Sequence, residues 1–115
     1  MQDITVYESE DLLSSQLIGD PRDHWRLDDW DLLLVICTTA GVEKLRIEPG
    51  ALGLTITDPA LRTIEINLAA TVVGGSSLGV GAWVVEILGI NKTNGVRRRL
   101  DGCALTVLAA CAKET

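Results

Sequence analysis

Apolar and polar residues alternate over much of this chain with a period of two, which is typical of β-strands with one buried face. The clearest example is the segment LTITDPALRTIEINL (54–68), in which two alternating runs flank the turn signal Asp58-Pro59. The pattern predicts a hairpin of two strands, each with one buried face, joined by about five residues.

Four other segments have strand-like patterns. Residues 3–9 are short and β-branched, and residues 83–90 are largely apolar. The continuous apolar run 32–37 predicts a central strand that is buried on both faces. Residues 96–107 alternate until Gly102, where we expect a bulge or a bend.

The remaining segments are less regular. Residues 10–25 fit either a helical turn or a strand, and residues 42–50 do not alternate cleanly. Residues 91–95 (NKTNG) predict a hairpin loop, and the Gly-rich run 74–81 predicts a flexible connection. Strong helix starts are absent. The chain therefore predicts an all-β fold, a single antiparallel β-sandwich (Ig-like) of about six to eight short strands.

Length and composition agree with one sandwich domain over residues 1–115. The chain has 115 residues, of which 47% are hydrophobic, enough for one core. No run of 18 apolar residues and no secretory signal are visible, so we expect no membrane contact.

The net charge of −6 is unevenly distributed. Residues 1–31, an acidic segment that contains two tryptophans, hold nine acids and two bases, a net charge of −7. Residues 32–115 hold seven acids and eight bases, a net charge of +1. This distribution argues against a nucleic-acid partner and suits docking onto a basic protein surface.

The cysteines give little sign of a disulfide framework or of a metal site. Cys37, Cys103 and Cys111 are odd in number, lie in apolar runs and form no CxxC pair. We expect them to be reduced and buried.

The order of segments resembles a known structural module. The stretch ITDPALRTIEINLAA (56–70) is followed by a Gly/Ser-rich step and then by LGVGAWVVEILGINKTNGVRRRLDGCALTV (78–107). This order is similar to the small β-sandwich modules of tailed-phage structural proteins, such as the N-terminal module of baseplate upper proteins. Gly81-Ala82-Trp83 stands where that family has Gly-x-Tyr, and the resemblance covers roughly residues 30–109.

The resemblance implies a non-enzymatic structural protein of a tailed phage or prophage, in the tail, baseplate or head-tail region. It implies a β-sandwich that assembles with itself, as a homo-oligomer, and with other phage structural proteins. It also implies a location in the virion, and in the host cytoplasm during assembly. No catalytic residue and no cofactor are carried over.

The most site-like cluster is GDPRDHWRLDDWD (19–31), with five aspartates, the only histidine and two tryptophans. Its aspartates do not follow the spacing of a calcium-binding loop, and a single imidazole gives no zinc set, so we expect no metal. Trp25, Arg26 and Trp30 have the residue types of an interface hot spot. Core anchoring of an entry strand is the alternative for the two tryptophans.

Three consecutive arginines follow the 91–95 loop. Alternation places Arg97 and Arg99 on one face and Arg98 on the other, and Glu86 on the preceding strand can pair across. A charged edge ribbon, or docking onto an acidic neighbour such as another copy, fits better than nucleic acid. The candidate interface residues are therefore Trp25, Arg26, Trp30, Arg97, Arg98 and Arg99.

No signature of an enzyme is visible: there is no G-x-S-x-G elbow, and His24 is the only imidazole base. We expect no catalytic activity. A second hypothesis, from another class, is a small carbohydrate- or ligand-binding β-sandwich in which Trp25 and Trp30 stack on sugar rings.

Overall fold

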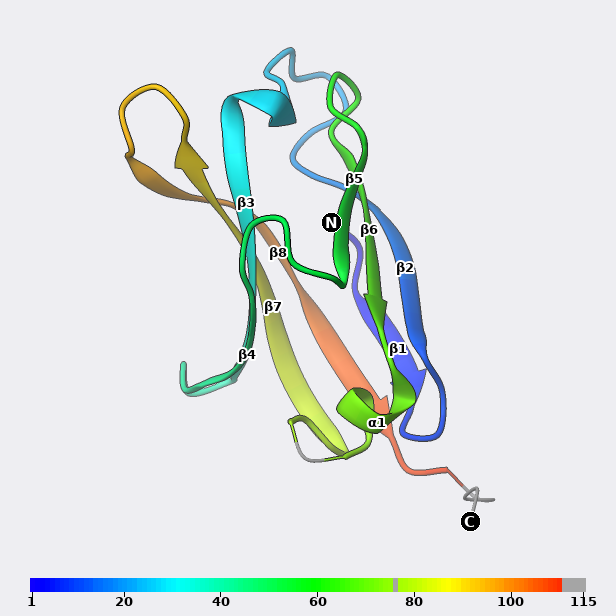
Figure 1. The fold of residues 1–115 in the computed structure, drawn as a ribbon. Helices are drawn as coiled ribbons and strands as arrows, with labels where there is room; N and C mark the ends of the chain where they lie inside the picture. Colours follow the sequence, from blue (N-terminus) through cyan, green and yellow to red (C-terminus); the bar gives the residue numbers. More distant parts are fainter. Residues whose placement is uncertain (76, 111–115) are drawn as a thin grey trace.

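The computed structural model describes residues 1–75 and 77–110 and is a two-layer, Ig-like β-sandwich (Figure 1). One sheet has five strands in the order β1-β8-β7-β3-β4, and the other has three in the order β2-β6-β5. The strands are β1 (Ile4–Tyr7), β2 (Leu12–Leu17), β3 (Trp30–Thr38), β4 (Glu43–Ile47), β5 (Leu54–Asp58), β6 (Thr63–Leu68), β7 (Gly81–Asn91) and β8 (Arg97–Leu108).

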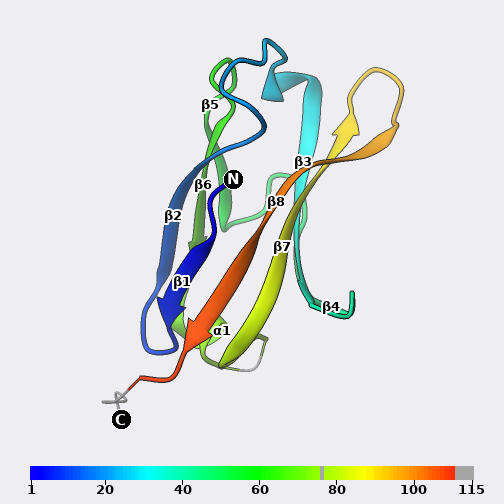
Figure 2. The ribbon, with the colours of Figure 1, turned by 180° about the vertical axis from the view of Figure 1, so that it is seen from behind.

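This architecture confirms the predicted fold class, with one difference. All strand pairs are antiparallel except β1 and β8, which run parallel, as the view from behind shows (Figure 2). The two sheets enclose one apolar core, and within the described residues no helix is long and apolar enough to cross a membrane.

The predicted hairpin is formed by β5 and β6. In β6 the alternating Ile64, Ile66 and Leu68 are buried, as expected. β5 differs, because Ile56 stays 36% exposed although it lies opposite Ile64. The reason is that β5 is an edge strand with no neighbour on its other side.

The predicted central strand is β3, which lies between β7 and β4. Its residues 32–36 are all buried, which confirms burial on both faces. Leu32, Leu34 and Ile36 belong to the core between the sheets. The strand therefore anchors the larger sheet.

Two segments that the sequence left open are edge strands. Residues 12–17 form β2, paired with β6, and residues 43–47 form β4, paired with β3. One short helix, α1 (Ala70–Val73), was not predicted; it buries Val73, and the Asp11 carboxylate accepts the N–H of Ala70.

The bulge expected at Gly102 lies two residues earlier. Ile87 pairs with Asp101 and Leu88 with Arg99, so Leu100 is the extra residue of β8. The Asp101 carboxylate accepts the N–H of Gly19 at 2.7 Å and the amino group of Met1 at 2.7 Å. Burial favours a higher pKa for Asp101. The two hydrogen bonds above and a third from the Gly102 N–H nevertheless hold the pKa of Asp101 below its usual range.

Cys37 and Cys103 are free thiols, partly rather than fully buried, and Cys111 lies outside the described residues. Burial, with the nearby charge of Asp3, raises the pKa of the Cys103 thiol to about 11. These two cysteines therefore act as small apolar residues at neutral pH.

The start of β3 packs closely on β7. A Cβ added at Gly89 would lie 2.7 Å from the Trp30 ring and 2.8 Å from a methyl group of Leu100. Only glycine lets these two side chains close over the strand at this position.

Replacing Gly89 with valine should therefore destabilise the fold by about 2 kcal/mol, because the added methyl groups overpack the space under Trp30. Urea unfolding followed by tryptophan fluorescence measures the change. The matched control is Ala82→Val, which adds two methyl groups at an exposed position of the same strand. Equal stability of the two variants would contradict the close contact.

Candidate assembly interface

The segment before β3 is organised by one buried arginine. Arg62, in the β5–β6 loop, is 3% exposed. Its Nε donates to the Ile18 carbonyl at 3.1 Å, and one Nη donates to the carbonyls of Asp23 and Trp25 at 2.9 and 3.1 Å. The other Nη donates to the Asp20 carbonyl at 2.6 Å. A single guanidinium thus fixes the path of the chain from residue 18 to residue 25.

The backbone around Arg62 is shaped for this role. Its φ of 56° lies in the left-handed region, which is costly for a residue with a side chain. The Asp58 carboxylate accepts the N–H groups of Ala60 and Leu61 and so closes the turn. The guanidinium lies 5.2 Å from the centre of the Trp25 ring, a cation–π contact.

The aspartates of this segment bind groups within the chain. Arg22 pairs with Asp20 at 2.8 Å and Arg26 pairs with Asp28 at 3.0 Å. The hydrogen bonds of these arginines hold the pKa of each partner carboxyl below its usual range. Among the described residues, no three His, Cys, Asp or Glu side chains are grouped so that they could hold a metal ion.

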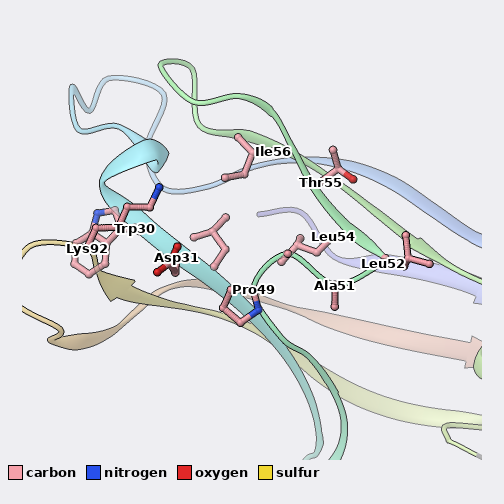
Figure 3. Close-up of a pocket in the computed structure, with 12 residues that line it drawn as sticks. Trp30, Asp31, Pro49, Ala51, Leu52, Leu54, Thr55, Ile56 and Lys92 are labelled. Carbon is pink, nitrogen blue, oxygen red and sulfur yellow. The ribbon is translucent and has the colours of Figure 1, made fainter.

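A groove of about 410 Å³ opens on the side of the sandwich bordered by β4 and β5 (Figure 3). We call this side the open side. Trp30 and Lys92 lie at one end of the groove, and Leu52 and Leu54 lie toward the other. Leu52 is 97% exposed. The groove thus presents apolar side chains to solvent.

Both walls of the groove contain strand edges without a partner. β4 pairs with residues 34–37 of β3 only. The N–H of Thr38 donates to the carbonyl of Val42, so the backbone N–H and C=O groups of the even-numbered residues of β3 point toward β4. The N–H and C=O groups of Leu32 point the same way, but no residue of β4 pairs with them. The residue that would continue β4 beside Leu32 is Pro49, which has no N–H.

β5 is the opposite wall. The carbonyl of Gly53 accepts the N–H of Asn67, so residues 53 and 55 face β6. The N–H and C=O groups of Leu54 and Ile56 therefore point outward, away from their own sheet. Residues 49–57 contain no acid and no base, so this edge is uncharged up to Asp58, the last residue of β5.

The other side of the sandwich has a pocket of about 430 Å³, lined by residues at the start of the chain and at the end of β2. There the buried Gln16 of β2 accepts the N–H of Gln2 at 2.8 Å and donates to its carbonyl at 3.2 Å. On the open side, the edge strand β4 differs from β5 because it carries three charged residues in EKLRI, residues 43–47. Charge is a common protection of a strand edge, and in β5 the only charged residue is Asp58, at the end of the strand.

The three arginines lie at the start of β8, and all are exposed. Arg99 and Glu86 are 3.6 Å apart, as predicted. Arg98 lies opposite Gly89, on the face of the sheet that carries Trp30, and Arg97 and Arg99 are on the other face. The predicted alternation is therefore present.

The six candidate residues are only partly brought together. Trp30 lines the groove, and Arg98 lies on the same face of the larger sheet. Trp25 instead packs under Arg62, while Arg26 is exposed and paired with Asp28. Both tryptophans are half-buried against the core, so anchoring is part of their role.

Sequence reasoning missed Arg62 and the groove. A single arginine after Asp58-Pro59 resembles an ordinary loop residue, and only the burial reveals its role. The absence of charge from residues 49–57 was the one available signal for the unprotected edge.

No protein-family model and no curated protein sequence matches the chain. Two solved structures with similar folds are CopC from Methylosinus trichosporium OB3b and the NK cell receptor NKp44. CopC is 14% identical, with a TM-score of 0.45 over 93% of this chain and 84% of its own. NKp44 is 9% identical, with a TM-score of 0.46 over 95% of this chain and 97% of its own.

Replacing Arg62 with methionine should destabilise the protein by about 3 kcal/mol, because buried carbonyl groups lose their donors. Urea unfolding gives the free energy. The control is Arg26→Met, which removes an exposed ion pair and should change the unfolding midpoint little. Similar losses in both variants would contradict the role given to Arg62.

Proposed function

We propose that this chain is a non-enzymatic structural protein that acts by protein–protein assembly, with copies of itself and with other structural proteins. The observation that carries the proposal is the unpaired edge of β5, which has no charge over residues 54–57, beside a groove lined mainly by apolar residues. Exposed edges of this kind pair readily with other chains, and proteins that stay monomeric usually protect them.

The setting that we propose for this assembly is the virion of a tailed phage or prophage. Support for the setting comes from the resemblance of residues 30–109 to small sandwich modules of tailed-phage structural proteins. The rigid sandwich and its exposed edge suit a part that is used in many copies.

A second candidate function is carbohydrate or ligand binding. The position of Trp30 in the groove favours it, since the accessible part of a half-buried indole can stack on a sugar ring. A matching contribution from Trp25 is less favoured, because Arg62 occupies a face of its ring. Glycan binding by a monomer would support this alternative.

Self-assembly predicts a defined oligomer by size-exclusion chromatography with light scattering. Ile56→Lys should weaken the association at least tenfold, because it places a charge at the unpaired edge. Leu13→Lys is the matched control: Leu13 is 66% exposed on β2, the opposite edge of the same sheet. A wild-type protein that is monomeric up to about 1 mM would contradict self-assembly.

A further inference from the structure

Basic residues that are not buried are concentrated in one hairpin. The described residues carry 15 acids and nine bases, and four of these bases lie in residues 92–99, which contain no acid. The rest of the described chain therefore has a net charge of −10. We call residues 92–99 the basic hairpin; its bases are Lys92, Arg97, Arg98 and Arg99.

The basic hairpin is well placed for contact with another molecule. In both ribbon views it extends from one end of the sandwich, away from the three-stranded sheet (Figures 1 and 2). Lys92, Arg97 and Arg98 are exposed, and within the described part of the chain none of them forms an ion pair.

The hairpin also has a defined shape before any contact. The Asn91 side chain accepts the N–H groups of Thr93 and Asn94, at 2.9 and 3.2 Å. Gly95 has a φ of 71° and donates to the Asn91 carbonyl at 2.8 Å. A preformed turn reduces the entropy that is lost on binding.

Acidic groups at the same end of the molecule are already partly neutralised, since Asp20 and Asp28 pair with Arg22 and Arg26. At the opposite end of the 47 Å long axis lies the acidic β1–β2 turn, residues 8–11 (Figure 1). There the carboxylates of Glu10 and Asp11 accept backbone N–H groups, and neither forms an ion pair with a described residue.

We propose that the basic hairpin of one copy docks on the β1–β2 turn of the next copy, so that the protein associates head to tail. The inference rests on the proposed assembly function and adds to it a second contact between copies, on surfaces other than the edge of β5. The complementary charges lie at opposite ends of one molecule, so the contact is heterologous and repeats from copy to copy.

Sedimentation equilibrium of the full chain tests the proposal. The average mass should grow with protein concentration and fall when salt is raised to about 0.5 M, because screening weakens exposed charge pairs. Arg98→Glu should weaken the association at least tenfold. Lys44→Glu, the same charge change at an exposed position of β4, should leave it unchanged.

A charge swap identifies the two surfaces. Glu10→Lys should weaken self-association as Arg98→Glu does, and an equimolar mixture of the two variants should associate again. Each junction in the mixture then joins opposite charges. No recovery in the mixture would overturn the assignment of the β1–β2 turn.

The remaining outcomes are separable. An oligomer that survives Arg98→Glu but dissociates in Ile56→Lys would overturn head-to-tail docking and leave assembly through β5 standing. A wild-type monomer would overturn both. Retention of single-stranded DNA by a monomeric wild-type protein, lost in Arg98→Glu, would replace the second copy with a nucleic acid.

Discussion

The path of the chain before β3 depends on one buried guanidinium, which donates its hydrogen bonds to backbone carbonyls rather than to a carboxylate. Arg62 bonds four carbonyl oxygens of residues 18–25 and stacks on Trp25. Without it, the buried Ile18 carbonyl and three partly buried carbonyls of that irregular segment would lose their donor, at a total cost of about 3 kcal/mol. In the same β5–β6 loop, the carbonyl of Pro59 accepts the N–H of Leu27 and so holds the short η1 turn (Leu27–Asp29), after which β3 begins.

A second constraint follows from where the edge strands end. On one side Gln16 of β2 is hydrogen-bonded to Gln2, shortly before β1, while on the open side β4 stops before Pro49 and β5 has no neighbour. The side chains of Leu54 and Ile56 in β5 point toward the core. They stay partly exposed to solvent because no strand covers that side. The groove is therefore a consequence of strand length, and it places the apolar side chains and the free backbone groups of β5 in one surface.

Much of the fold could be predicted from the period of two. The β5–β6 hairpin, the buried β3 and the alternation of Arg97–Arg99 all follow from local patterns that the structure retains. β2 and β4 were left open because edge strands are partly solvated and their patterns are weaker. The role of Arg62 and the position of the bulge depend on contacts between segments far apart in sequence, which periodicity does not report.

The central claim is that the free edge of β5 is covered when copies assemble. Amide hydrogen exchange of Leu54 and Ile56, followed by NMR in dilute and in concentrated protein, tests it most directly. We expect both amides to exchange rapidly in dilute solution and to become protected as the association proceeds. An oligomer in which both amides still exchange as freely as in the monomer would contradict the account.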